Sequence, residues 1–256
     1  MPRQLASARR HYNVSRLIAL RAVREATRVR TQGPGAVASV VATHQVTQAV
    51  TSQQAVAQML AEQSIDEAAQ ALLNSLAFTT SADSLTAMLD QVDTDLEFER
   101  LVASLVQDAG RAAESVATAV RPRIYHVRYL SPPSCSRCAV LAGRIYRYSD
   151  GFRRHPNCDC VMIPTTVASP YVQDPVELFK RGLVTGLSKA DAQALADGAD
   201  FGQIVNVRGP RAAGLQEAGR VLARRGRPTP EGIYRLAGDD RARAVELLTQ
   251  YGYLLP

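Results

Sequence analysis

Apolar residues recur at helical spacing through most of the first 120 positions. In the first predicted helix, over residues 5–30, Leu17, Leu20 and Arg24 share one stripe. The run Gly33-Pro34-Gly35 then breaks the helical pattern. Further helices are predicted over residues 36–62, 64–76, 81–91 and 94–120. The first 121 residues are therefore predicted to form an elongated helical bundle or arm.

Two polar signals set the predicted ends of these helices. Ser64 and Glu67 have the spacing of a capping box, in which a hydroxyl and a carboxylate each accept a hydrogen bond from an otherwise unpaired backbone N–H group. This pair predicts the start of the 64–76 helix. Arg121-Pro122 predicts the end of the 94–120 helix, because proline cannot continue a helix.

Residues 31–61 contain no Asp, Glu, Lys or Arg. The helix predicted there is expected to be buried on several sides, either within a bundle or against another subunit. Glutamines, threonines and His44 interrupt its apolar residues, so it lacks the run of about 20 apolar residues that a membrane span needs. No membrane association is predicted.

The pattern changes at residues 124–129, where polar and apolar side chains alternate as in a β-strand. A second strand is predicted at 144–148, and the apolar residues 161–164 close this segment. Helices return over residues 175–181, 188–197, 212–225, 230–237 and 239–251. The predicted fold is mainly α with a small β-rich module (α+β), divided into a helical block (1–121), the module (122–170) and a C-terminal region of short helices (171–256).

Composition supports a helical protein whose charge is segregated. The chain is 46% hydrophobic, with 5% aromatic residues and no Trp, and such small side chains favour closely packed helices. The net charge of +6 divides into +7 over residues 1–30, −9 over 31–120, +6 over 121–170 and +2 over the remainder. These blocks predict either binding to an acidic partner and nucleic acid, or pairing of opposite charges within the fold or an oligomer.

All four cysteines lie between residues 135 and 160. Cys135-x-x-Cys138 places two thiols on one tight turn, and His155, Cys158 and Cys160 supply three more donors. No secretory signal is recognisable, which predicts folding in a reducing cytoplasm, where clustered cysteines more often bind metal than form disulfides. Thiolates with an imidazole suit a closed tetrahedral zinc site, so we predict one structural zinc ion per chain.

Five donors compete for the four positions of such a site. Cys135, Cys138 and Cys158 are the first choices, while Cys160 and His155 compete for the fourth place. Alternation along a strand would point the side chains of Cys158 and Cys160 to one face, which favours Cys160. Two disulfides or four unmodified thiols are the alternatives to a zinc site.

No other motif predicts catalysis. Gly-rich nucleotide loops, a Gly-x-Ser-x-Gly turn and a His-Glu-x-x-His helix are all missing from the sequence, and a fully ligated zinc ion leaves no position for a substrate. We therefore expect a protein that is not an enzyme. The isolated histidines His11, His44 and His126 are interpreted as surface or core residues.

One basic cluster is a candidate for nucleic-acid contact. Its arginines alternate with Tyr146, Tyr148 and Phe152, which is typical of surfaces that combine phosphate binding with stacking on bases. A solvated face explains the same pattern equally well. The arginines are Arg144, Arg147, Arg153 and Arg154.

The cysteine motif also resembles that of a known family. Cys135-x-x-Cys138-x-x-Leu141-x-Gly143, followed by His155-Pro156-Asn157-Cys158-x-Cys160 and Pro164, is similar to a module of the Mu F-like minor head proteins of tailed bacteriophages. The resemblance covers about residues 123–164. Segments within 196–206 and 229–253 also look like minor head proteins of phages that infect actinobacteria.

This resemblance implies a structural minor capsid protein that is assembled in the host cytoplasm and resides in the virion. Several copies would lie at the portal vertex and inside the head, in contact with the portal and/or major capsid protein. The protein would aid head assembly and the packaging or ejection of DNA. The alternative function is a zinc-containing DNA-binding protein, which the basic residues in 1–30 and 121–170 favour.

Overall fold

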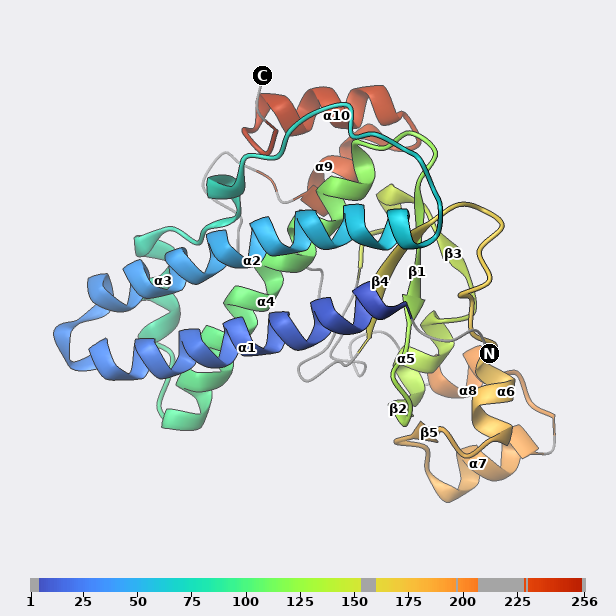
Figure 1. Cartoon of the computed structure of the whole chain (residues 1–256). Coiled ribbons are helices and arrows are strands. Elements are labelled where there is room, and N and C mark those ends of the chain that lie inside the picture. Colours follow the sequence, from blue (N-terminus) through green and yellow to red (C-terminus); the bar gives the residue numbers. More distant parts are fainter. Residues whose placement is uncertain (1–4, 153–159, 197, 207–227, 229, 255–256) are drawn as a thin grey trace.

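The computed structural model describes residues 5–152, 160–196, 198–206, 228 and 230–254. Within them the chain is mainly helical with two small sheets, which confirms the predicted α+β class at that level (Figure 1). The long helices are α1 (Ala6–Val29), α2 (Pro34–Glu62) and α4 (Asp95–Ala119). The shorter ones are α3 (Ala82–Leu89), α5 (Ser136–Leu141), α6 (Pro175–Lys180), α7 (Lys189–Ala196), α8 (Phe201–Asn206), α9 (Pro230–Ala237) and α10 (Arg241–Gln250).

The three long helices form the predicted helical block. Figure 1 shows α1 and α2 as an antiparallel hairpin and α4 crossing behind both. Ala19, Ala22 and Ala26 of α1 are buried in the core that α1 shares with α2 and α4, because small side chains let helix backbones approach closely. Leu17 and Leu20 instead point to solvent and are 54% and 57% exposed. The buried stripe of α1 is therefore made of alanines rather than leucines.

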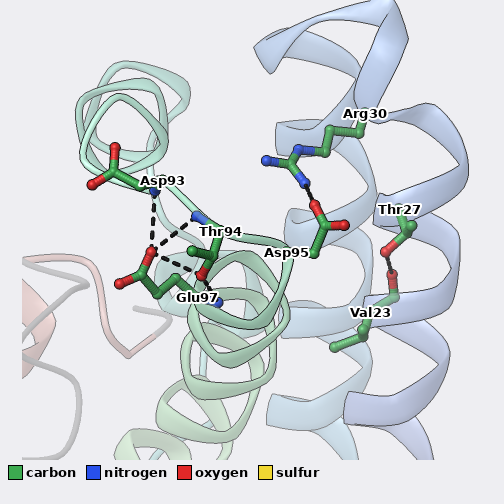
Figure 2. A network of polar contacts seen from close by, with 7 residues as sticks. All are labelled: Val23, Thr27, Arg30, Asp93, Thr94, Asp95 and Glu97. Atoms are coloured by element: carbon green, nitrogen blue, oxygen red, sulfur yellow. Dashed lines mark hydrogen bonds and ion pairs between the residues drawn. The ribbon is translucent and has the colours of Figure 1, made fainter.

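The N-terminus of α4 is fixed by a capping box (Figure 2). The Glu97 N–H group donates to Thr94 Oγ1 at 3.2 Å, and the Thr94 N–H group donates to Glu97 Oε2 at 3.0 Å. These hydrogen bonds lower the pKa of the Glu97 carboxyl group. Beside this cap, Arg30 Nη1 lies 2.7 Å from Asp95 Oδ1 and ties the end of the α1 segment to the start of α4.

The helix predicted over residues 64–76 is wrong. Ser64 has a φ of 57° and ends α2, with the Ile65 N–H group donating to the carbonyl oxygen of Leu60. The Glu67 carboxylate does not return to Ser64 but accepts from Arg123 Nη2 at 2.6 Å. The segment is extended instead, apart from the 3-10 turn η2 (Ser75–Phe78), and runs toward the C-terminal residues.

A three-stranded antiparallel sheet follows the block. Its strands are β1 (Tyr125–Tyr129), β3 (Ile145–Tyr146) and β4 (Val161–Thr165), with β1 in the centre. These match the predicted strands at 124–129, 144–148 and 161–164, although the middle one is shorter. Val127 and Tyr129 pack toward α1 and α2, so alternation places His126 and Arg128 on the opposite face.

That opposite face carries a further set of short elements. The strands β2 (Ser134–Cys135) and β5 (Val184–Thr185) pair in parallel, and α5, α6, α7 and α8 surround them. Leu178, Phe201 and Val205 from these helices share one core with Leu130 and Met162. The sequence predicted α6 and α7 but not α5, α8 or this second sheet.

The last helices return to the helical block. Figure 1 shows α9 and α10 against the end of α4, and Ile233, Tyr234 and Leu248 are buried in the same core as α4. The predicted helices at 230–237 and 239–251 are thus confirmed, whereas the one at 212–225 lies outside the described residues. The described apolar residues between Leu178 and Val205 therefore belong to one core, and those between Ile233 and Leu254 to another.

The length and apolar character of the helices bear on whether any of them could span a membrane. Among the described residues, none of the helices combines the length and the apolar character that spanning a bilayer requires.

Candidate metal centre

Three of the predicted zinc ligands come from two separate elements of the module. Cys135 ends β2 and occupies the N-cap position of α5, and Cys138 lies in the first turn of that helix. Cys160 directly precedes β4. The chain between them includes η3 (Tyr148–Asp150) and β3.

The three sulfur-bearing side chains belong to one core cluster. Cys138 and Cys160 are 3% and 5% exposed, and Cys135 is half-buried at the edge of the same cluster. Apolar side chains, among them Leu130, Phe152 and Met162, make up the rest of it. Cys138 and Cys160 are thus shielded from solvent within one apolar core, and Cys135 borders it.

Two hydrogen-bond donors already point at these sulfurs. The Cys138 backbone N–H group donates to Cys135 Sγ at 3.4 Å, and Arg128 Nη1 donates to Cys160 Sγ at 2.7 Å. The Arg128 guanidinium also lies 4.0 Å above the centre of the Phe152 ring. Both sulfurs therefore accept a hydrogen bond within the module.

The frame around the cysteines depends on Gln173 and Gly143. The buried Gln173 amide accepts from the Leu130 N–H group at 2.6 Å, and its own backbone N–H donates to the Ala142 carbonyl oxygen at 3.1 Å. It therefore joins the end of β1 to the end of α5. A Cβ atom on Gly143 would lie 3.0 Å from the Pro175 ring, so this motif glycine allows α6 to approach.

His126 lies on the same face of β1 as Arg128 and is almost completely buried. Its ring stacks on the Tyr146 ring, with the two ring centroids 5.3 Å apart. Burial disfavours the imidazolium form, and with the positive charge of Arg128 it lowers the pKa of His126 to about 3. His126 is therefore a neutral core residue. Of the two roles that the sequence allowed, surface or core, the structure shows the second.

The structure describes only three of the five predicted zinc ligands. His155 and Cys158, like Arg153 and Arg154, lie outside the described residues. Within the described ranges, no group of three or more His, Cys, Asp or Glu side chains is arranged so that it could hold a metal ion. The described cysteines therefore do not form a metal site by themselves, although thiols of this kind are ligands that suit zinc.

The aromatic residues of the predicted nucleic-acid surface do not lie on the surface. Tyr146, Tyr148 and Phe152 are buried, so their rings cannot stack on bases. Of the two described arginines, Arg144 lies 4.4 Å from the Tyr146 ring centre and Arg147 pairs with Asp239 at 2.7 Å. The aromatic part of that prediction is therefore wrong, because these rings serve the core.

A cleft of about 630 Å³ is lined by residues of α1 and α4 and by Cys160. Its lining includes His11 of α1 and Glu114 of α4, whose Nε2 and Oε1 atoms are 2.5 Å apart. Both side chains are buried. Sequence reasoning missed this pair, since nothing local signals that residues 103 positions apart will meet.

Comparison with known proteins adds no relative to this description. Neither protein-family models, nor curated protein sequences, nor solved structures match the chain.

Proposed function

We propose that this protein is a structural minor head protein of a tailed bacteriophage, similar to the Mu F-like proteins, with a zinc-stapled module. One observation supports the proposal: Cys138 of the first motif and Cys160 of the second are buried in the same apolar core, and Cys135 packs against it. The described cysteines from both halves of the motif that resembles the phage family thus belong to the same core.

Zinc in this module would link the start of α5 to the residues that precede β4. Cys135, Cys138 and Cys158 would each supply a thiolate, and the fourth ligand would come from Cys160 or His155. Arg128 would offset part of the negative charge that several thiolates place on the site. When bound, the ion supplies folding free energy and no reaction chemistry, because a site closed by four protein ligands has no open position.

A structural role also agrees with how the module is joined to the helical block. Val161 and Ile163 of β4 pack with Ala55 and Met59 of α2, so the module is attached to the long helices through its sheet. The block would present its surface to the portal and/or the major capsid protein, in several copies around the portal vertex. The module would hold the chain in the shape that this contact needs.

Mass spectrometry of purified virions tests the proposal. In particles of the phage that encodes the chain, we expect this protein at a few copies for each portal ring. The Cys135→Ser and Cys138→Ser double variant should be lost from particles, while Ser136→Ala, on the same turn, should be incorporated normally. Virions that contain no copy of the wild-type protein would refute the head-protein assignment.

A further inference from the structure

The outer face of α1 carries a dense set of exposed arginines. This helix contains six arginines and one acidic residue, a net charge of +5. All six arginine side chains are exposed, and none forms an ion pair with a described residue. They are Arg9, Arg10, Arg16, Arg21, Arg24 and Arg28.

Four of these arginines form one straight ridge, defined as Arg10, Arg21, Arg24 and Arg28. At 100° per residue they fall within about 60° of the helix circumference, and at 1.5 Å per residue they extend over about 27 Å. Arg9 and Arg16 flank the ridge on one side. The acidic residue, Glu25, lies off the ridge with its Oε2 atom 3.6 Å from His44 Nε2 of α2.

The ridge is rigid and lies at the outside of the block. The opposite face of α1, with Ile18, Ala22 and Ala26, is buried in the core with α2 and α4. At the N-terminus of the helix, the Glu62 carboxylate accepts from the Ala6 N–H group at 2.7 Å and from the Ser7 N–H group at 2.8 Å. Figure 1 shows α1 along the edge of the layer of long helices. The arginines are therefore held in a fixed register before any partner arrives.

We propose that this arginine ridge of α1 binds the phosphate backbone of double-stranded DNA. A duplex carries one negative charge for about every 1.7 Å of its axis, so a 27 Å ridge faces enough phosphates to engage every arginine. Arginine binds phosphate oxygens through two parallel N–H groups. None of the ridge arginines forms an ion pair with a described carboxylate, although the charge of Arg10 helps to lower the pKa of the Glu62 carboxyl group. The inference rests on charge and geometry alone, so it stands independently of the zinc site and of the head-protein assignment.

The structure favours DNA over a membrane surface. A helix that lies in a bilayer interface inserts a continuous apolar face opposite its charges. In α1 that apolar face is already buried against α2 and α4. The exposed apolar side chains Val14, Leu17 and Leu20 lie among the arginines, where they would contact sugars or a groove edge and not a lipid core.

Fluorescence anisotropy with a labelled 30-base-pair duplex tests the ridge in the full-length protein. The ridge variant is R21Q/R24Q/R28Q, whose positions are exposed and whose new residues suit a helix. The matched control is K180Q/R181Q/K189Q, which removes the same charge from exposed positions in and beside α6 and α7. Melting curves for all three proteins establish that each variant is folded.

Wild-type protein should bind with an affinity that falls steeply as salt rises. The ridge variant should bind about tenfold or more weakly at low salt, and its slope of log affinity against log salt should be shallower by about 2.7, since each lost phosphate contact contributes about 0.9. The control should bind within about twofold of wild type. Equal weakening of both variants, or no wild-type binding at low salt, would overturn the proposal.

Two further measurements separate DNA from other acidic partners. If the ridge instead binds acidic residues of a second copy, sedimentation should show salt-sensitive self-association that the ridge variant abolishes, without duplex binding. If it binds anionic lipid, vesicles of phosphatidylserine should retain wild-type protein while the duplex does not. Either result would overturn the assignment to DNA.

Discussion

Arg241 shows how one side chain can complete the end of a helix. It comes from α10, and its guanidinium donates to the carbonyl oxygens of Ala119 at 2.9 Å and Ile124 at 3.2 Å, with Arg121 as a further acceptor. These oxygens belong to the C-terminus of α4 and the turn after it, where carbonyl groups lack helical partners. The same guanidinium lies 4.4 Å from the Tyr148 ring centre.

Replacing Arg241 by alanine should destabilise the protein strongly. The change removes charge-assisted hydrogen bonds and leaves buried carbonyl oxygens unpaired, which together cost about 2–4 kcal/mol of unfolding free energy. Arg243→Ala is the matched control, because Arg243 only forms an exposed pair with Glu246 at 2.8 Å. That change should leave the midpoint of a denaturant titration almost unchanged, because an exposed ion pair contributes little to stability. Similar losses in the two variants would contradict the capping role.

His126 should make stability depend on pH. Its pKa is lowered to about 3 in the folded chain, mainly by burial, while an exposed histidine in the unfolded chain has a pKa of about 6.5. Between these values only the unfolded chain binds the proton. The contribution of His126 is therefore complete above pH 6.5 and is lost as the pH falls toward 3, at about 1.4 kcal/mol per pH unit.

The variant His126→Phe keeps an aromatic ring against Tyr146 and cannot take up a proton. Its unfolding free energy should fall less steeply than that of wild type between pH 6.5 and pH 4, as measured by urea titration at each pH. Parallel curves for the two proteins would show that His126 is not the residue responsible.

At the scale of elements, two sequence patterns with the spacing of a capping box differ in the structure: one begins a helix and the other does not. Thr94 and Glu97 form the capping box that begins α4, whereas Ser64 and Glu67 have the same spacing and begin no helix. The difference arises from Arg123, which binds the Glu67 carboxylate from 56 residues away. A local pattern cannot reveal such a partner, so helices set by periodicity were predicted well and this one was not.

Alanine substitutions at the two hydroxyl residues test this contrast. Thr94→Ala should lower the unfolding free energy by about 1 kcal/mol, because the Glu97 N–H group loses its acceptor. Ser64→Ala should have almost no effect, since the exposed Ser64 caps nothing. Thermal unfolding of both variants measures the difference. A loss at Ser64 equal to that at Thr94 would contradict the observed end of α2.

At the scale of the whole molecule, the C-terminal residues close the core that the middle of the chain begins. Leu254 forms a β-bridge with Leu73, and the Asn74 N–H group donates to the Tyr253 carbonyl oxygen at 3.0 Å. The Tyr253 ring is fully buried, 5.6 Å from the Phe78 ring. The extended segment after α2 therefore exists because the C-terminus pairs with it.

Tyr253→Ala should consequently destabilise the helical block, although residue 253 lies far from it in sequence. Loss of a fully buried aromatic ring costs about 3–5 kcal/mol. Tyr251→Ala is the control, since Tyr251 is only partly buried beside the same core and should cost clearly less. Chemical denaturation of both variants decides the point. Equal effects would mean that the C-terminus does not close this core.

The sequence shows the spacing of Cys135, Cys138 and Cys160 but not their surroundings. The fold places all three in or against one apolar core, and whether they bind zinc stays a prediction. Arg128 could not be assigned to Cys160, because its position depends on the register of β1 against β4. Long-range strand register and the return of α9 and α10 to α4 are set by tertiary packing, which a local pattern does not encode.

The zinc content of the purified full-length protein is the most direct test of the account. Protein prepared under reducing conditions and dialysed should contain about one zinc ion per chain by elemental mass spectrometry, and chelation should lower its melting temperature. Ser136→Ala should retain the metal, while the Cys135→Ser and Cys138→Ser double variant should lose it. A chain that is fully folded without zinc, with its four cysteines joined in two disulfides, would contradict the account.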